Sequence, residues 1–314
     1  MTKKIILDCD HGHDDAVAIM LAAASTEIQI LGITCVGGNS GLSNTVNNAL
    51  KICTLIERTD IKVYSGANKP IKYELFTAEY VHGKTGLDRK GDPIIVESNY
   101  KTQEKSAIDF IIETCKSSSD QIYLCPTGPL TNIALSLEKD PSIKKNIKEI
   151  VFMGGAAMCL GNTTPSAEFN IYVDPHAANI VLESGIPLTM MGLDVTHQVN
   201  VNSKIIKSMN ENKNKSSKFF GELMEFYTIF HKELYETEET PLHDPCVIAY
   251  LLDPSIFSGK EVNVTVEENS ELTRGETVVD WLGVTKRPVN CFVMNEANDE
   301  KFFQLLKDKL SLLP

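Results

Sequence analysis

Short apolar runs alternate with helical patterns through the first 190 residues, and this rhythm constrains the fold more than any other feature. The apolar runs predict buried strands at residues 4–9, 29–36, 62–64, 121–125, 147–153 and 187–191. Apolar residues recur with a helical period at residues 14–24, 44–57, 106–116, 130–137 and 175–183. Strands that alternate with helices form parallel sheets with helices on both faces. The sequence therefore predicts an α/β fold with an open, mostly parallel sheet flanked by helices.

The pattern changes after residue 200, where helices are predicted at residues 204–212, 217–235 and 245–252. Short strands and a closing helix at residues 296–312 follow. No internal repeat or Pro/Gly/Ser-rich linker divides the chain, so residues 1–314 are predicted to form a single domain with these C-terminal additions. Residues 66–103 form a long polar segment without clear periodicity, and loops of that length are usually functional.

The charge balance and the cysteines exclude several classes of protein. Lys and Arg total 30 and Asp and Glu total 42, so the net charge of −12 disfavours binding to nucleic acid. No apolar run of about 18 residues predicts a membrane span, and the N-terminus lacks the apolar core of a signal peptide. The eight cysteines are scattered without a CxxC pair, which predicts reduced thiols and a cytoplasmic protein.

Four carboxylates, those of Asp8, Asp10, Asp14 and Asp15, lie within eight residues where the first predicted strand ends. Ligands of open α/β sheets bind outside the carboxyl ends of the strands, so this position favours chemistry. Asp14 and Asp15 could simply begin the next helix, where negative charge is favourable. Four carboxylates so close together would nevertheless repel one another unless a cation lay among them. Oxygen ligands of this kind predict a hard cation, Ca²⁺ or Mg²⁺.

Two other motifs that begin in this way fit the residues less well. An EF-hand loop counted from Asp8 would need Gly sixth and Glu twelfth, but His13 and Ile19 stand there. A phosphatase with an aspartyl nucleophile would use Asp8 as the nucleophile and Asp10 as the general acid. This alternative leaves the other two carboxylates of the cluster without a role.

Polar residues also follow later predicted strands or begin later helices. Alone, each has an ordinary structural explanation: a tight turn, or a helix cap such as Asp244 before Pro245. These segments are Thr127-Gly128-Pro129-Leu130-Thr131-Asn132, Met153-Gly154-Gly155 with Asn162 beyond it, Glu168-Phe169-Asn170 and His243-Asp244-Pro245.

Together, these residues resemble the inosine-uridine nucleoside hydrolase family along essentially the whole chain. The resemblance rests on five motifs in the family's order: DCDHGHDD at residues 8–15, GGN at 37–39, TGPLTN at 127–132, EFN at 168–170 and HDP at 243–245. It implies an open, mostly parallel α/β sheet, a tightly bound Ca²⁺ and assembly into a homotetramer or dimer. The implied reaction is hydrolysis of the N-glycosidic bond of a small-molecule ribonucleoside to free base and ribose. One departure is His11, where the family usually has Pro or another residue before the Gly.

The resemblance also implies roles for individual residues. The metal ligands would be Asp10, Asp15, the main-chain carbonyl of Thr127 and Asp244. The ribose would be surrounded by Asp14, Asn39, Met153, Asn162, Glu168, Phe169 and Asn170. Asp10 is expected to act as the general base toward a calcium-bound water. His82 and His243 are the candidates that protonate the leaving base.

The residues that would bind the base determine which nucleoside is cleaved. His231 and Tyr235 lie one helical turn apart, and with His82 they resemble the pocket of pyrimidine-preferring members. A Gln would be expected where His231 stands, and both residues could instead belong to a packed helix face. The resemblance of these three residues to the pyrimidine-preferring pocket makes uridine and cytidine the expected substrates. Hydrolysis of another N-riboside, such as a purine nucleoside or nicotinamide riboside, and non-catalytic nucleoside binding are the alternatives.

Overall fold

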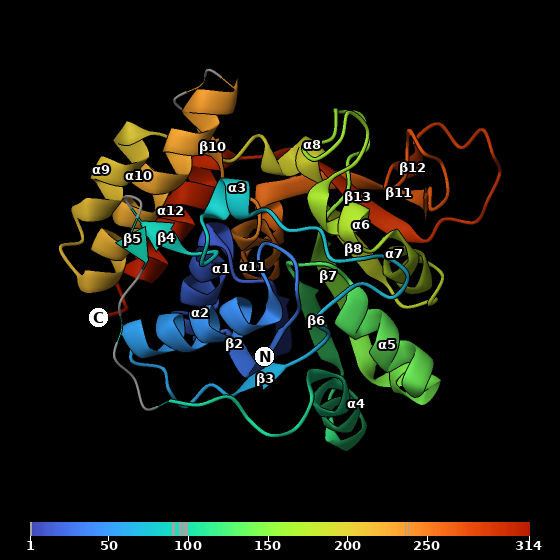
Figure 1. Ribbon diagram of the computed structural model, residues 1–314, viewed down its shortest axis with the longest axis horizontal. Helices are drawn as coiled ribbons and strands as arrows, with labels where there is room; N and C mark the ends of the chain where they lie inside the picture. Colours follow the sequence, from blue (N-terminus) through green and yellow to red (C-terminus); the bar gives the residue numbers. More distant parts are fainter. Residues whose placement is uncertain (1, 90–91, 94–95, 97–99, 236, 238) are drawn as a thin grey trace.

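A nine-stranded sheet forms the centre of the protein in the computed structural model, which describes residues 2–89, 92–93, 96, 100–235, 237 and 239–314 (Figure 1). The strand order is β12-β11-β13-β8-β7-β6-β1-β2-β3. The strands are β1 (Lys3–Cys9), β2 (Ile28–Cys35), β3 (Val63–Ser65), β6 (Ile122–Pro126), β7 (Ile147–Met153), β8 (Leu188–Met191), β11 (Phe257–Val266), β12 (Thr277–Asp280) and β13 (Cys291–Ala297). Neighbouring strands from β3 to β8 are parallel, and β13 is parallel to β8, whereas β11 is antiparallel to both β13 and β12. The predicted open, mostly parallel sheet is confirmed.

Helices cover both faces of this sheet, and the core consists of two large apolar clusters, one on each face. One cluster packs against α1 (His13–Ala23), α2 (Leu42–Leu55), α10 (Lys215–Tyr235), α11 (Pro245–Leu252) and α12 (Asp299–Leu310). The other packs against α4 (Ala107–Ser117), α5 (Thr131–Lys139) and α7 (Pro175–Leu182). The remaining helices are α3 (Glu79–His82), α6 (Phe169–Val173), α8 (Leu193–Thr196) and α9 (Ser203–Asn210). Strands buried on both faces read as continuous apolar runs, which is why the sequence located them so closely.

The C-terminal part differs from its prediction in two respects. The predicted short strands are β11, β12 and β13, which extend the central sheet, and β11 is longer than expected, with 10 residues. The predicted closing helix begins too early, because residues 296–297 are the end of β13. The side chain of Asn298 then accepts a hydrogen bond from the main-chain N–H of Lys301 and so caps α12.

The long segment after β3 contains more structure than its polarity indicated. It carries the short helix α3, and Gln103 at its end pairs with Tyr64 of the β3 edge. Strands β4 (Asp88–Arg89) and β5 (Asp92–Pro93) form a small sheet of their own, as do β9 (Asn200–Val201) and β10 (Thr240–Pro241). The segment therefore brings residues 79–82 back over the body of the domain (Figure 1).

The order of the strands places a crevice beside β1. From β1 the chain proceeds through β2 to β3 on one side of the sheet, and from β6 through β7 to β8 on the other. Loops at the carboxyl ends of β1 and β6 consequently diverge, and this point of reversal is where open α/β sheets bind ligands.

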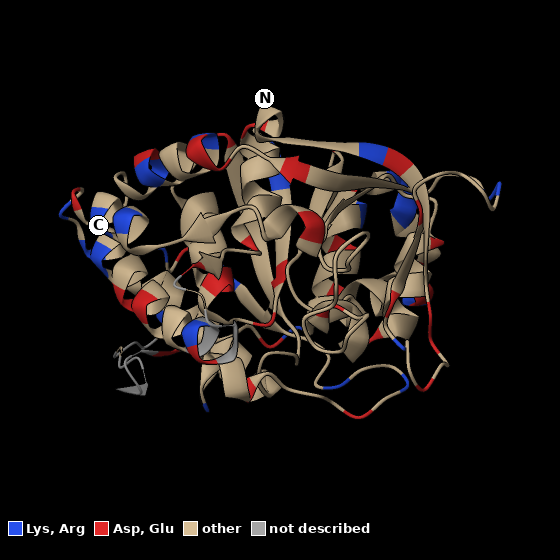
Figure 2. Cartoon of the chain, turned by 90° about the horizontal axis from the view of Figure 1, so that it is seen from above, with Lys and Arg blue, Asp and Glu red and all other residues tan. Residues whose placement is uncertain are grey.

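The outer surface carries both signs of charge. In Figure 2 the lysines and arginines are spread over several helices and loops and are interspersed with acidic residues. Among the described residues, no helix is both long enough and apolar enough to cross a membrane. All eight cysteines are free thiols, and all except Cys159 are buried.

Candidate active site

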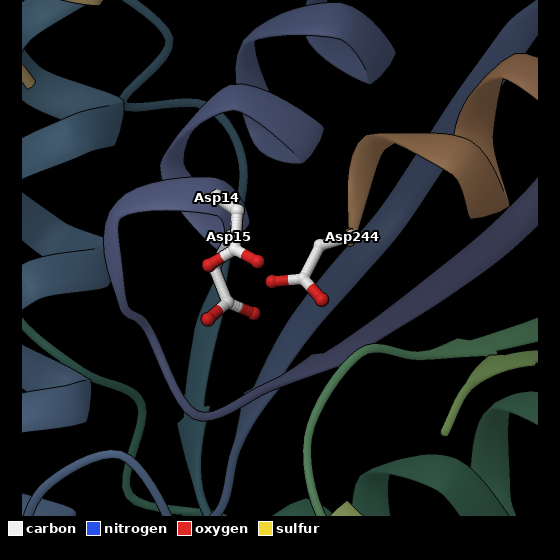
Figure 3. Close-up of side chains that lie close together, drawn as sticks. All are labelled: Asp14, Asp15 and Asp244. Atoms are coloured by element: carbon white, nitrogen blue, oxygen red, sulfur yellow. The ribbon is translucent and has the colours of Figure 1, made fainter. Parts of the chain in front are cut away.

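A cluster of carboxylates lies at the carboxyl end of β1, where the chain turns into α1. Asp14 and Asp15 occupy the first turn of α1, and Asp244 stands at the start of α11, more than 200 residues later. Carboxylate oxygens of these three residues lie within 4.8 Å of one another and point toward a common centre (Figure 3). Pro245 occupies the first position of α11, where its fixed φ suits the start of a helix.

Asp10 lies beside this cluster, and only one of its two carboxylate oxygens accepts a hydrogen bond within the described residues. Its Oδ2 accepts a hydrogen bond of 2.7 Å from the main-chain N–H of Asn39. Its Oδ1 is fully buried and has no hydrogen-bond partner among the described residues. Two glycines make room for this side chain: a Cβ at Gly38 would lie 2.1 Å from Asp10 Oδ2, and one at Gly128 would lie 2.8 Å from Oδ1. A buried carboxylate oxygen held in this way is suited to a cation or a water.

Asp15 is connected to the loop after β6. It accepts hydrogen bonds from the main-chain N–H of Gly12 at 2.7 Å and from the Thr127 hydroxyl at 2.6 Å. The main-chain carbonyl of Thr127 accepts a hydrogen bond of 2.7 Å from the Asn170 side chain. Three of the predicted metal and ribose positions are therefore joined by direct contacts.

The electrostatics of the cluster require a compensating positive charge. Burial raises the pKa of Asp10, Asp15 and Asp244 above the ordinary range, and it raises the pKa of Asp14 to about 7. No lysine or arginine is among the buried residues in the described part of the chain. Burial and repulsion between neighbouring carboxylates favour the neutral form of each group, so the ionised cluster needs a cation beside it. The residues present fit a hard metal ion, so the cluster can bind a metal.

Asp8, the remaining carboxylate of the N-terminal motif, has a structural position. Its Oδ1 accepts hydrogen bonds from Thr34 at 2.6 Å and from Asn132 at 2.7 Å, so it joins three segments at the end of the sheet. It is fully buried and, like Asp10, does not line the cavity described below. Its partners Thr34 and Asn132 do not line the cavity either, whereas Asn39, the partner of Asp10, does. The structure gives no support to Asp8 as the nucleophile of a phosphatase.

A cavity of ≈ 340 Å³ opens above the carboxylates. Most of the predicted substrate and metal residues line it together, although they come from all parts of the chain. These are Asp14, Asn39, His82, Thr127, Met153, Asn162, Glu168, Phe169, Asn170, His243 and Asp244. Asp10 and Asp15 are not among the lining residues, since they lie deeper in the protein.

Glu168 and Asn162 shape the wall opposite the carboxylate cluster. Glu168 caps α6 by accepting hydrogen bonds from the main-chain N–H groups of Asn170 and Ile171, and it accepts a third from Gly155. Burial raises its pKa to about 7 despite these donors. The side-chain oxygen of Asn162 accepts a hydrogen bond of 2.9 Å from the main-chain N–H of Phe169. Both side chains are therefore held in place before any ligand binds.

Three histidines also line the cavity. His82 comes from α3, His243 precedes Asp244, and His197 follows α8. The Nδ1 atom of His243 lies 2.8 Å from the Thr196 hydroxyl, and the ring centroids of His197 and His243 are 5.7 Å apart. Positions 231 and 235 belong to α10, but the side chains of His231 and Tyr235 lie outside the described residues.

Several lining residues were not predicted from the sequence, among them His197 and Tyr227, each of which could contact a nucleobase. Tyr227 is buried and lies eight residues before Tyr235, which places the two on roughly the same face of α10. That spacing is visible in the sequence. No comparable signal points to His197, because its place depends on how the loop after β8 folds back to the cavity.

The turn that carries Asp10 has an unusual backbone. His11 is buried and adopts a φ of 27°, in the region that side chains rarely occupy. A proline could not adopt this angle, since its ring fixes φ near −65°. The φ observed at His11 is therefore one that a proline at this position could not share.

Gly38→Ala tests the close approach to Asp10. Because the new Cβ would overlap Asp10 Oδ2, we expect the free energy of unfolding to fall by about 1–3 kcal/mol and catalytic activity to fall with it. Urea unfolding and turnover are the measurements. Gly41→Ala is the matched control, because a Cβ there meets nothing within 4 Å. Equal effects of both substitutions would contradict the proposed packing.

Comparisons with known proteins agree with this arrangement. A family model described as inosine-uridine preferring nucleoside hydrolase matches residues 5–304. A protein of Shewanella sp. (strain ANA-3) named pyrimidine-specific ribonucleoside hydrolase RihA is 45% identical over 313 residues, covering 99% of this chain and 97% of its own. A Photobacterium profundum protein of the same name is 43% identical over 312 residues, covering 99% of each chain.

Solved structures show the same likeness. The purine-preferring ribonucleoside hydrolase from Gardnerella vaginalis superimposes with a TM-score of 0.90 at 35% identity, covering 98% of both chains. A plant nucleoside hydrolase, PpNRh1, gives a TM-score of 0.92 at 31% identity, covering 99% of both chains.

Proposed function

This chain belongs to the inosine-uridine preferring nucleoside hydrolase family and is a ribonucleoside hydrolase, and from that premise we propose that it cleaves uridine and cytidine with Ca²⁺ as its metal and Asp10 as its general base. The observation that carries the proposal is the buried carboxylate cluster at the floor of a cavity whose wall is polar and already ordered. The proposed ligands are Asp10, Asp15, Asp244 and the carbonyl of Thr127, with Asp14 close enough to join them.

The reaction requires a water to attack the anomeric carbon of ribose while positive charge develops on the sugar. The residues of the cluster would hold Ca²⁺, whose positive charge would favour loss of a proton from the attacking water. Asp10 is suited to receive that proton, because its Oδ1 is buried and has no hydrogen-bond partner among the described residues. The Asn39 N–H fixes the carboxylate through its other oxygen.

The ribose is proposed to bind between the carboxylate cluster and the wall formed by Asn162, Glu168 and Asn170. Asp14 and Glu168 would accept hydrogen bonds from the sugar hydroxyls, and the two amides can donate or accept. Negative side chains around the sugar also stabilise the oxocarbenium-like transition state, as carboxylates do in other glycoside hydrolases. Met153 and Phe169 supply the apolar part of this surface.

The leaving base is proposed to lie beside the histidines that line the cavity. His82 and His243 both line it, and either imidazolium could give a proton to the base as the C–N bond breaks. His231 and Tyr235 are proposed to complete the base pocket from α10. The names of the 43–45% identical relatives support a pyrimidine base. The Gardnerella vaginalis hydrolase is instead named as purine-preferring, which makes a purine nucleoside the second candidate.

Ribose release tests the reaction, the metal and the base preference together. The substrates are uridine, cytidine and inosine, assayed with the protein as purified, after prolonged chelation, and after Ca²⁺ or Mg²⁺ is added back. We expect chelation to abolish release, Ca²⁺ to restore it, and uridine and cytidine to exceed inosine. A ligand present at about 100 times its Kd stabilises a protein by roughly 2.7 kcal/mol, so Ca²⁺ should also raise the Tm of the chelated protein.

Other outcomes would each change the proposal. Restoration by Mg²⁺ alone would overturn Ca²⁺ as the metal, and preference for inosine would overturn the pyrimidine pocket. Binding of ribose and Ca²⁺ without turnover would indicate a nucleoside-binding protein.

We also propose that the enzyme is a cytoplasmic homo-oligomer, either a dimer or a tetramer. Eight free cysteines, seven of them buried, are consistent with a reducing compartment. Sedimentation at several concentrations, with Ca²⁺ present, is the test of the assembly.

A further inference from the structure

His13, the first residue of α1, lies between Asp14 and Asp15 of the carboxylate cluster, which follow it in the chain, and His82, which its ring contacts. It directly precedes Asp14 and Asp15, it is fully buried, and it does not line the cavity. Its Nδ1 atom lies 3.0 Å from Nδ1 of His82, and its Nε2 atom lies 2.6 Å from the main-chain carbonyl oxygen of Asp88. Nothing in the proposed reaction uses this side chain.

The contact with Asp88 decides which nitrogen of His13 carries the proton. A carbonyl oxygen can only accept a hydrogen bond, so His13 Nε2 must be the donor at 2.6 Å. Neutral His13 then has a lone pair at Nδ1. Protons on both nitrogens would place a positive charge on a side chain without exposed surface, which is costly.

The lone pair on His13 in turn decides the tautomer of His82. Two ring nitrogens 3.0 Å apart need one donor and one acceptor, so His82 Nδ1–H donates to His13 Nδ1. The main-chain N–H of His13 also points toward His82 Nδ1, but at 3.4 Å it is beyond the usual hydrogen-bond range of about 2.7–3.2 Å. The ring-to-ring contact is therefore the stronger of the two.

We propose that His13 is a positioning residue that holds the neutral His82 ring in the Nδ1–H tautomer, so that His82 carries a proton on Nε2 only when it is an imidazolium. This rests on the proposed role of His82 at the leaving base. In that step the C1′–N bond breaks, its electron pair stays with the base, and the base takes the proton from His82 Nε2. The neutral His82 that remains keeps its Nδ1 proton, which stays hydrogen-bonded to His13 Nδ1. Its Nε2 atom regains a proton from solvent before the next turnover.

Packing around His13 favours a fixed arrangement. The rings of Phe226, Tyr227 and His82 lie nearly parallel to it, with centroid distances of 5.2–5.4 Å. Asp88 is fixed as well, since its carboxylate accepts hydrogen bonds from the Thr85 hydroxyl and the Lys84 N–H. A Cβ at Gly12 would lie 2.7 Å from His82 Cε1, so the ring packs directly on the turn before α1. His82 therefore has little freedom to rotate away from His13.

The first test reads the tautomer without any assay of activity. Two-bond ¹H–¹⁵N correlation spectra of the Ca²⁺-loaded, ¹⁵N-histidine-labelled protein distinguish Nδ1–H from Nε2–H, and His82→Gln identifies the His82 signals. We expect neutral His82 to be the Nδ1–H form in the unmodified protein. In His13→Phe, which keeps a buried ring but removes both hydrogen bonds, we expect the Nε2–H form to appear. His176→Phe is the matched control, because His176 lies on α7 against Glu268, away from the cavity.

The second test asks whether the tautomer matters for the leaving base. In enzymes where a histidine acts in the wrong tautomer the loss reaches about 10⁴-fold, so a loss on the order of 10²-fold or more is expected for uridine with His13→Phe. A riboside with an activated leaving group, such as p-nitrophenyl riboside, should lose far less, because its departure needs no proton.

The outcomes separate this proposal from the proposed function. An Nε2–H form of neutral His82 in the unmodified protein, or an unchanged tautomer in His13→Phe, would overturn the role of His13 whatever the activity. Equal losses on both substrates would assign His13 a purely structural role. If His82→Gln leaves uridine hydrolysis intact while the tautomer follows His13 as expected, then the proposed acid is wrong and the positioning is right.

Discussion

2′-Deoxyuridine is expected to be cleaved roughly 10⁴–10⁵-fold less efficiently than uridine, because a site built to hydrogen-bond a hydroxyl is left with unpaired polar groups when the hydroxyl is missing. The polar groups facing the cavity are buried before substrate binds: Asp14 is 4% exposed, Glu168 2% and Asn170 5%. Burial raises the pKa of both carboxyl groups to about 7, a sign that each lacks the hydration of an ordinary carboxylate. The measurement is kcat/KM for the two nucleosides at saturating Ca²⁺.

The intrinsic chemistry acts in the opposite direction, which makes this comparison informative. An electron-withdrawing hydroxyl beside the anomeric carbon disfavours positive charge there, so 2′-deoxyribosides are the more labile compounds in water. Slower cleavage of 2′-deoxyuridine can therefore come only from the site. Comparable efficiency on both nucleosides would show that the pocket does not hold the ribose as proposed. Release of uracil from neither compound would return the question to other N-ribosides.

The strands of the parallel sheet could be located from the sequence because burial on both faces makes each strand a continuous apolar run. β7 has its predicted bounds, and β1 differs by one residue. The site residues at the carboxyl ends of these strands could be predicted for the same reason, once the resemblance gave their order. Thr127 and Asp244 needed that resemblance, since a turn and a helix cap are the ordinary explanation of each.

Features that depend on tertiary contacts could not be predicted. Asp8 and Asp10 are the same residue type two positions apart, yet Asp8 accepts hydrogen bonds from Thr34 and Asn132 while Asp10 accepts one from the main-chain N–H of Asn39. Alternation of side chains at the end of β1 does not separate them, because both are fully buried. The sequence marks His13 only as a member of the first motif, since only the return of the segment after β3 brings His82 and Asp88 against it.

Asp10→Asn is expected to lower kcat/KM for uridine by about 10²–10⁴-fold, the usual contribution of a positioned general base, and by more if Ca²⁺ affinity also falls. The substitution keeps the shape of the side chain, and its amide oxygen can still accept from the Asn39 N–H. It removes a buried carboxyl group whose pKa is raised by burial and by the neighbouring charges of Asp15 and Asp14. Loss of that repulsion should leave the metal-free protein at least as stable to urea as the parent. Activity is thus predicted to fall while stability to urea does not, a combination that a misfolded variant could not show.

Asp8→Asn is the matched control for this experiment, since it makes the same chemical change two residues earlier in the chain. The amide oxygen can still accept from Thr34 and Asn132, and neither of these partners lines the cavity as Asn39, the partner of Asp10, does, so turnover should stay within about tenfold of the parent. If Asp8→Asn abolished turnover while Asp10→Asn did not, the attacking group would have to be sought at Asp8, as in the aspartyl-phosphatase alternative. If Asp10→Asn lost both activity and stability in chelator, its carboxylate would be structural, and the proton of the attacking water would require another acceptor. Asp14 is then the first candidate, because it lines the cavity and lies within the same carboxylate cluster.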